Sequence, residues 1–320
     1  MSVIQCYHPD VIWEKRYLEN EDIENIMFFG IELEIESDSN NDNPHQEMVD
    51  IIETYLNQHG MSKLFVYERD GSLNEGFEIV THPMSWNYYE EHNKNFKDIL
   101  SLLSNGGYHS HNGGRCGLHV HVNRKYFGFS QQDLDKYRQW GLTSSDLTQL
   151  NNSKIEESIN NCAFIFEKFK EDFIKLSCRK VFDYCSFLLN SVDNSVDPNS
   201  LDRDLILQRL DRSDRYKVVN IRNYYTIEFR LMRGTLLFVS FDTKIRAIKN
   251  VVEVAKSSTG IYNFRDITTY LETTEKKEIM ESYFQDRDIA ESKEYISLNS
   301  KKEYRISNEN FILRKRLMEV

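Results

Sequence analysis

Four short segments, far apart in the chain, alternate apolar and polar residues in the way typical of a half-buried β-strand. They cover residues 30–36, 76–81, 117–123 and 226–231. Because successive side chains of a strand point to opposite faces, each segment predicts one apolar and one polar face. The polar residues are unusual, since a solvated sheet normally carries a mixture of Lys, Thr, Ser and Gln. Here they are carboxylates, imidazoles, an amide and a guanidinium: Glu32, Glu34, Glu36, Glu78, His119, His121, Asn123, Glu228 and Arg230.

Carboxylates gathered on one sheet face repel each other unless they are protonated, solvated or neutralised by a cation. Oxygen ligands with an occasional imidazole suit Mg²⁺ or Mn²⁺. Arg230, two residues beyond Glu228, indicates that the ligand also carries an anion such as a triphosphate. From spacing alone, a cation–nucleotide site and a solvated sheet face remain alternatives.

Composition narrows the class of protein. The formal net charge of −11 argues against a general affinity for nucleic acid or for anionic membranes, so neither is expected as a partner. No apolar run approaches the length of a membrane-spanning helix, and no signal peptide is visible. The five cysteines lack framework spacing, which predicts reduced thiols and a cytoplasmic location.

The order of helical and strand patterns favours an α+β fold over a doubly wound parallel sheet. Strand alternation is clean, which favours a mostly antiparallel sheet with helices packed on one face and the ionic face forming the active site. Strand pairs are expected within 64–81 and 216–231. Helices are expected over 45–58, 86–103, 133–140, 151–190, 201–210 and 241–257.

Three regions are expected along the chain. Residues 1–26 form an N-terminal segment and residues 27–256 a catalytic domain. Residues 257–320 are charged and carry few large apolar clusters, which predicts a helical C-terminal appendage.

A zinc site is an alternative interpretation of residues 109–121. His109, His111 and Cys116 precede His119 and His121, and such a cluster could hold zinc. A second paired Cys/His block is missing, which weakens that alternative. Glycine-rich phosphate loops are also missing from the sequence, so any ATP would be held by cations and arginine.

The same residues, in the same order, resemble the putative amidoligase family of glutamine synthetase-like carboxylate–amine ligases. The matching motifs lie at residues 29–34, 69–83, 116–122, 215–220 and 226–236. Together they extend over about residues 27–256, so the resemblance leaves both ends of the chain uncovered. Glu36 and Glu75 lie outside the motifs and are expected to be solvated.

The resemblance implies the curved antiparallel sheet of the glutamine synthetase catalytic domain. It also implies an ATP-dependent enzyme that uses Mg²⁺ or Mn²⁺ and forms an amide or isopeptide bond through an acyl phosphate. The residue roles that it implies are metal ligation by Glu32, Glu34, Glu78, His119 and Glu228, nucleotide or phosphate binding by His121, Arg215 and Arg230, substrate binding by Asn220, and catalysis by Asp70 and Arg230.

The expected substrates are a small-molecule or peptide carboxylate and an amine, with a protein substrate also open. Two other functions remain. One is a metal-dependent hydrolase that uses His119, His121 and the carboxylates to activate water. The other is a non-catalytic interaction protein with a ligase-like fold.

Overall fold

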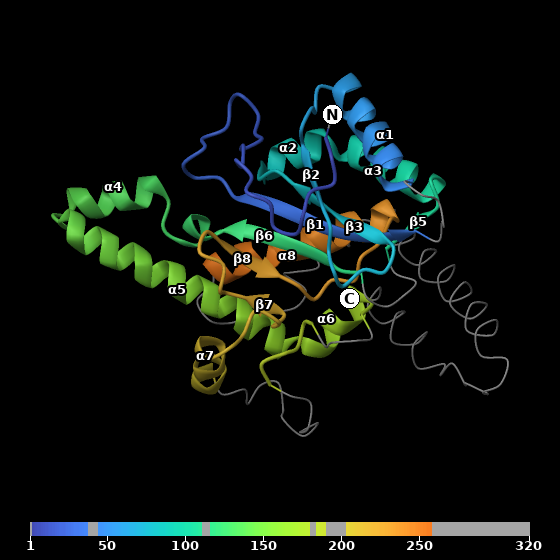
Figure 1. The fold of residues 1–320 in the computed structure, drawn as a ribbon. Helices are drawn as coiled ribbons and strands as arrows, with labels where there is room; N and C mark the ends of the chain where they lie inside the picture. The colour runs from blue at the N-terminus through green and yellow to red at the C-terminus, as the bar shows by residue number, and fades with distance from the viewer. Residues whose placement is uncertain (1, 38–43, 111–115, 180–183, 190–202, 258–320) are drawn as a thin grey trace, which may run out of the picture.

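A mostly antiparallel open sheet with helices on one face forms the body of the molecule (Figure 1). The computed structural model describes residues 2–37, 44–110, 116–179, 184–189 and 203–257. The predicted C-terminal appendage therefore lies outside the described residues. The mixed helix and sheet architecture agrees with the α+β fold that the alternating segments predict.

The sheet has the order β2-β3-β1-β6-β8-β7, and β4 and β5 also pair with β1. Every pairing between these strands in the described residues is antiparallel. Both predicted strand pairs are confirmed, as β2–β3 and β7–β8. The strands are β1 (Phe28–Ser37), β2 (Phe65–Glu68), β3 (Gly76–Thr81), β4 (Met84–Ser85), β5 (Tyr108–His109), β6 (Leu118–Asn123), β7 (Val219–Asn220) and β8 (Thr226–Phe229).

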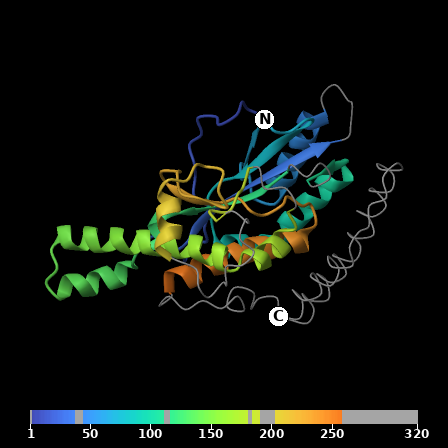
Figure 2. The ribbon, with the colours of Figure 1, turned by 90° about the horizontal axis from the view of Figure 1, so that it is seen from below.

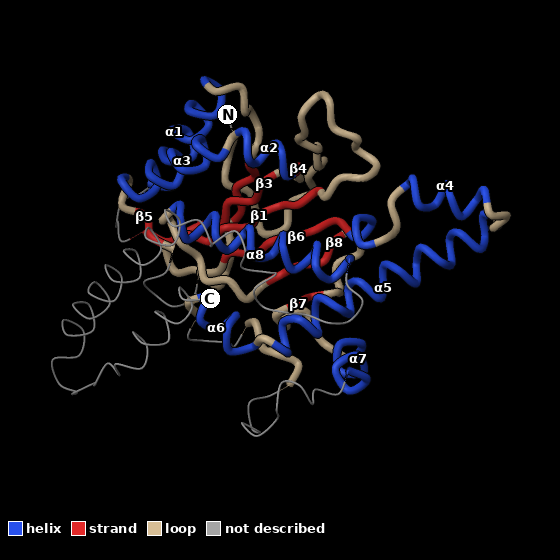
Figure 3. Tube along the Cα trace, turned by 180° about the vertical axis from the view of Figure 1, so that it is seen from behind, coloured by secondary structure: helices blue, strands red, loops and turns tan. Residues whose placement is uncertain are grey.

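Helices cover the apolar face of the sheet, as Figure 3 shows from behind. The buried residues of α3, α5 and α8 belong to one hydrophobic core together with Ile31, Leu33 and Ile35 of β1. The helices are α1 (Pro44–Gln58), α2 (Trp86–Glu91), α3 (Asn93–Asn105), the 3₁₀-helix η1 (Arg124–Phe127), α4 (Gln131–Gln139), α5 (Ser144–Lys168), α6 (Lys170–Ser177), α7 (Arg203–Asp211) and α8 (Phe238–Ser257).

Two expected helices differ from the structure. The helix expected over 86–103 is divided at His92 into α2 and α3. The helix expected over 151–190 begins earlier, at Ser144, because Thr143 and Asp146 form a capping box. It breaks at Phe169, and α6 then ends at Cys178, whose backbone is left-handed. The apolar periodicity predicted the helical segments correctly. The exact residues at which these helices begin and end depend on the local backbone conformation, which periodicity does not predict.

None of the five cysteines, all of which lie in described residues, forms a disulfide. No helix in the described ranges combines the length and the apolar character that crossing a bilayer requires.

A buried carboxylate on α5 is expected to make stability depend on pH. Glu167 accepts hydrogen bonds from the backbone of Leu188 and Leu189, and burial raises its pKa from an ordinary value of 4.5 to about 7. The folded state therefore binds the proton more tightly. The resulting stabilisation is full below pH 4.5 and is lost as the pH rises through 7.

We expect the free energy of unfolding to fall by about 3 kcal/mol more in the wild type than in Glu167→Gln over this range. The Gln side chain keeps an acceptor for the Leu188 N–H but does not titrate. Urea unfolding of both proteins at several pH values measures the difference. Parallel pH profiles would contradict the expectation.

Candidate functional site

The central strand β1 carries the acidic residues around which the candidate site is arranged. Glu32 lies opposite His119 of β6, and Glu34 lies opposite Glu78 of β3. Side chains opposite each other on antiparallel strands are close neighbours. The sheet register therefore brings together carboxylates and an imidazole that come from three separate parts of the sequence.

The neighbouring strands extend this group. His121 of β6 lies opposite Glu228 of β8, which in turn lies opposite Asn220 of β7. Arg230 follows β8, and its backbone N–H donates to the carbonyl of Val218. The polar residues of β1, β3, β6, β7 and β8 thus form one continuous cluster.

Burial argues against the interpretation of this sheet face as solvated. The exposed fractions of Glu34, Glu78 and Glu228 are only 6%, 4% and 4%. A solvated face would leave its carboxylates in water. Since buried charges require a compensating partner, the solvated alternative is excluded for these three residues.

Two groups of side chains could each hold a metal ion. One consists of Glu32, Glu78 and His119, and the other of Glu32, His121 and Glu228. In each group the potential ligand atoms lie within 4.8 Å of one another. Glu32 belongs to both groups, so one carboxylate would connect two neighbouring cations.

The distances around the histidines suit metal ligation. His121 Nε2 is buried and lies 2.8 Å from Glu32 Oε1 and 3.9 Å from Glu228 Oε1. Its other ring nitrogen, Nδ1, is 3.2 Å from Thr226 Oγ1. A ligating histidine commonly uses its second nitrogen in this way. A buried imidazole nitrogen that faces two carboxylates fits Mg²⁺ or Mn²⁺.

The charges in the cluster shift pKa values in opposite directions. Burial raises the pKa of Glu32, but the charge of His121 and a hydrogen bond from His119 outweigh it and hold this pKa well below its usual range. Burial and the charges of Glu32 and Glu34 raise the pKa of Glu78 well above its usual range. The carboxylates thus differ in their affinity for protons, and a cation bound by Glu78 would displace its proton.

The pKa of His121 shows the strength of the acidic field. Burial lowers it, but the charges of Glu32 and Glu228 raise it to about 9. An imidazole that would be mostly neutral at about pH 7 in water is therefore cationic beside these carboxylates. A metal ion would take over that balancing charge.

Glu228 is held by three polar neighbours. Asn220 Nδ2 donates to its Oε2 at 2.7 Å, Asn223 Nδ2 reaches the same oxygen at 3.3 Å, and the Arg230 guanidinium contacts Oε1. Asn220 therefore orients a candidate metal ligand. Its predicted contact with substrate stays a prediction.

Gly117 allows the backbone of the chain to lie close to the His119 ring and to Glu34. Its N–H donates to Glu34 Oε2 at 2.5 Å, and a Cβ atom at this position would lie 2.6 Å from His119 Nε2. Glycine is required because any side chain would displace the His119 ring. Glu34 lies 3.9 Å from that ring nitrogen but belongs to neither candidate metal group.

Asp70 and Arg215 lie at the margin of the cluster. Asp70 is half-buried in the turn between β2 and β3, where its Oδ1 accepts a hydrogen bond from the Ser72 backbone at 2.7 Å. Arg215 is exposed and donates to the Tyr216 hydroxyl at 3.0 Å. Neither belongs to a candidate metal group, and their predicted catalytic and phosphate-binding roles stay predictions.

Sequence reasoning missed Glu68, a buried carboxylate that lies opposite Glu78. The alternation of Tyr67 and Glu68, at the end of the predicted strand, could have indicated it. The expectation that Glu36 is solvated was wrong, because Glu36 is buried and accepts a hydrogen bond from the Asn74 backbone at 3.0 Å. Glu75 is exposed, as expected.

The structure does not favour the zinc alternative. Of the described residues, neither Cys116 nor His109 belongs to a candidate metal group, and His111 lies outside the described residues. Burial raises the pKa of the Cys116 thiol, which disfavours the thiolate that zinc would bind.

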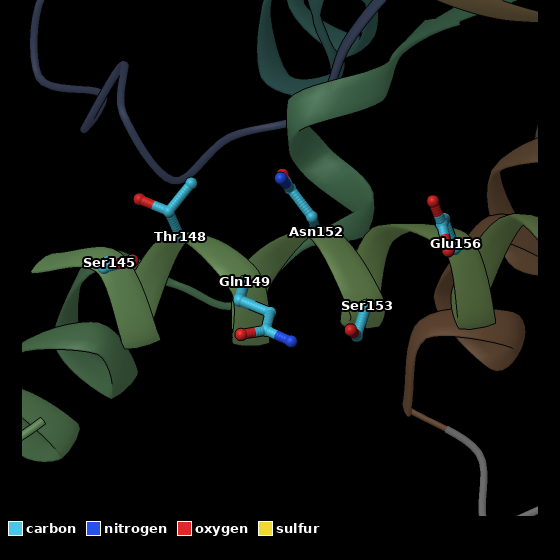
Figure 4. A pocket seen from close by; sticks show the side chains of 6 residues that line it. All are labelled: Ser145, Thr148, Gln149, Asn152, Ser153 and Glu156. Atoms are coloured by element: carbon cyan, nitrogen blue, oxygen red, sulfur yellow. The ribbon is translucent and has the colours of Figure 1, made fainter.

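A polar depression on α5 is a less convincing site. It is lined by Ser145, Thr148, Gln149, Asn152, Ser153 and Glu156 (Figure 4). The α4–α5 hairpin that carries it projects away from the sheet, as Figure 1 and Figure 2 show. Its single carboxylate and the absence of a basic side chain among these six give it little chemistry.

The open antiparallel sheet and its buried carboxylate–histidine cluster define a class of protein with a candidate two-cation centre. Comparison with known families agrees with the resemblance seen in the motifs. The family described as "putative amidoligase enzyme" matches residues 27–245. The chain belongs to this family of ligase-type enzymes. No curated protein matches it.

Proposed function

We propose that the chain is an ATP-dependent ligase that joins a carboxylate to an amine. The observation that carries this proposal is the pair of candidate metal groups that share Glu32, with Arg230 beside Glu228. Two adjacent cations and a guanidinium would neutralise the negative charge of a bound polyphosphate. Membership of the amidoligase family supports the ligase class.

The chain's own residues would hold the cofactor. Glu32, Glu78 and His119 would bind one cation, and Glu32, His121 and Glu228 the other. When bound, Mg²⁺ or Mn²⁺ would neutralise phosphate charge and make the γ-phosphorus of ATP a better electrophile. In this proposal the sheet is of the glutamine synthetase type and the enzyme is cytoplasmic.

Arg230 would stabilise the phosphoryl group during transfer. Its side chain is 17% exposed, so the guanidinium is largely held by the protein yet accessible to a ligand. Its contact with Glu228 fixes its orientation before ATP binds. Arg215 would contact further phosphate oxygens, and Asn220 would keep Glu228 in place.

The reaction then follows from the charges. A carboxylate oxygen of the substrate attacks the γ-phosphorus, the bond to the β–γ bridging oxygen breaks, and ADP leaves. The amine nitrogen attacks the carbonyl carbon of the acyl phosphate, the carbon–oxygen bond to phosphate breaks, and inorganic phosphate leaves. Asp70 would accept the proton that the amine loses.

Thermal unfolding tests the nucleotide site. A non-hydrolysable ATP analogue with Mg²⁺ is expected to raise the melting temperature of the wild type, because it binds only the folded state. At about 100 times Kd the gain is about 2.7 kcal/mol. Glu228→Gln is expected to lose this gain, since it removes a ligand charge from one group.

Glu36→Gln is the matched control. It makes the same chemical change to a buried carboxylate of β1, outside both candidate groups. The proposal would be contradicted if the analogue raised the melting temperature without Mg²⁺, or if it raised the melting temperature of Glu228→Gln as much as that of the wild type. Hydrolysis of a substrate without ATP would instead support the hydrolase alternative.

A further inference from the structure

The segment that follows β8, residues 230–234, carries Arg230, whose guanidinium contacts Glu228. This segment is not a regular strand and takes part in a single isolated β-bridge. At its far end, the N–H of Gly234 donates to the carbonyl of Cys116 at 3.0 Å. The position of the Arg230 side chain therefore depends on the contacts that hold an irregular stretch of backbone.

Arg179 supplies two of these contacts. Its Nη1 lies 3.4 Å from the carbonyl oxygen of Arg230 and 3.3 Å from that of Met232, so one nitrogen of the guanidinium serves both acceptors. Only 8% of Arg179 is exposed. Hydrogen bonds from an ionised donor are stronger than neutral ones, and burial strengthens them further. The two contacts are therefore expected to restrain the backbone of Arg230 itself.

The end of α6 places Arg179 against the segment. Cys178, at which α6 ends, has a positive φ of 56°, which is uncommon for a residue other than glycine. The next N–H, that of Arg179, donates to Ser177 Oγ at 3.1 Å, and the N–H of Arg233 donates to the carbonyl of Ser177 at 3.2 Å. Unfavourable backbone conformations persist where their surroundings over-determine them. Contacts with the segment that carries Arg230 thus help to hold this turn.

Lys244 of α8 holds the same segment at a second point. Its Nζ donates to the carbonyl of Arg233 at 2.7 Å, and only 1% of the residue is exposed. Its partner there is a backbone carbonyl rather than a carboxylate. Because a buried ammonium is unfavourable without hydrogen bonds, this contact accounts for a cation in the packed interior. Two buried cations, from α8 and from the end of α6, therefore bind carbonyls of one short segment.

We propose that Arg179 is a positioning residue for Arg230. It holds the backbone from which the Arg230 guanidinium reaches Glu228, while Lys244 anchors the same segment three residues further on. A misplacement of about 1 Å can lower a rate about 10²-fold, so the support matters even when Arg230 itself is intact. This inference rests on the proposed function, because it concerns the same site.

Hydrogen exchange at the Arg230 side chain tests the inference without relying on activity. In protein labelled with ¹⁵N-arginine, the Nε–H of Arg230, which donates to the carbonyl of Tyr184 at 3.4 Å, is the signal that disappears in Arg230→Lys. In the wild type it is expected to exchange with water more slowly than that of the exposed Arg212. In Arg179→Met it is expected to exchange about tenfold faster, the usual effect of losing a hydrogen bond to a charged group.

Arg16→Met is the matched control. One guanidinium nitrogen of Arg16 also serves two carbonyls, those of Ser62 at 3.3 Å and Lys63 at 3.1 Å, which precede the edge strand β2. Both Arg16→Met and Arg179→Met are expected to lower the melting temperature, but only Arg179→Met should accelerate exchange at Arg230. If Arg179→Met does not fold, Arg179→Gln replaces it, since this change also removes the charge, and the same acceleration is expected.

A double-mutant cycle shows whether Arg179 acts through Arg230. Single-turnover formation of ADP at saturating ATP is expected to fall about 10–10²-fold in Arg179→Met. In the Arg230→Lys background the same substitution is expected to have almost no further effect, because the guanidinium that it positions is already absent. A purely structural role would lower the rate by the same factor in both backgrounds.

The inference is overturned if Arg230 exchanges equally fast in the wild type and in the Arg179 variant, or as fast as Arg212 in the wild type. Equal acceleration by Arg16→Met, or equal rate losses in both backgrounds, also overturns it. If the Mg²⁺–ATP analogue stabilises the wild type in these cases, the proposed function stands alone. If exchange is accelerated as expected but the analogue does not bind, the positioning contact stands and the nucleotide proposal fails.

Discussion

Replacement of Glu32 by Gln is expected to abolish binding at both candidate cation sites at once. Glu32 contributes an oxygen to each group, whereas Glu78 and Glu228 each contribute to one. Loss of a partner that merely orients a ligand costs about 10–100-fold in affinity, so loss of this shared carboxylate is expected to cost at least about 100-fold at each site. Amide formation should be lost with it.

Titration with Mn²⁺, followed by electron paramagnetic resonance, measures the number of ions bound. Two ions are expected for the wild type and for Glu36→Gln, one each for Glu78→Gln and Glu228→Gln, and none for Glu32→Gln over the same concentration range. Retention of one tightly bound ion by Glu32→Gln would show that the carboxylate is not shared.

Arg230→Lys is expected to separate catalysis from cation binding. A lysine keeps the positive charge but loses the planar fork that contacts Glu228 Oε1 and approaches the carbonyl of Tyr184 at 3.4 Å. We expect a fall in kcat of about 10²–10³, the cost of removing one donor that stabilises transition-state charge. Because the substituted ammonium group still compensates Glu228, Mn²⁺ binding should change little.

Single-turnover formation of ADP, with ATP saturating, reports the effect on phosphoryl transfer. Arg246→Lys is a matched control, since Arg246 is another partly buried arginine, paired with Asp242 and Glu90 on the helical face. An equal fall in both variants would point to general destabilisation. A change confined to KM in Arg230→Lys would assign Arg230 to binding alone.

Most of the candidate site could be predicted because it depends on a period of two. Once Glu32, His119 and Glu228 are assigned to strands, alternation puts each of them on the face opposite the apolar residues. Which strands are neighbours is a separate question. The placement of β1 between β3 and β6 depends on contacts between residues far apart in the sequence, and neither the motifs nor the resemblance predicted it.

The burial of Glu36 and the position of the N-terminal segment depend on local backbone geometry, which the pattern of apolar and polar residues does not predict. Glu36 looked like one more carboxylate of an exposed strand end, but the turn after β2 folds back and gives it the Asn74 N–H. The N-terminal segment also lacks strand alternation. Gln5 is placed beside β2 by backbone hydrogen bonds with Tyr67 and Arg69, and His8 by its N–H bond to Glu68.

The shared carboxylate also restricts how a chain of this kind could change over generations. A substitution at Glu78 or Glu228 removes one ligand set and leaves the other intact, so a descendant with a single cation is one step away. A substitution at Glu32 has no such intermediate, since both sets are damaged together. Divergence towards one-metal chemistry would therefore begin at Glu78 on β3 or at Glu228 on β8, whereas a change at Glu32 would cost both sites together.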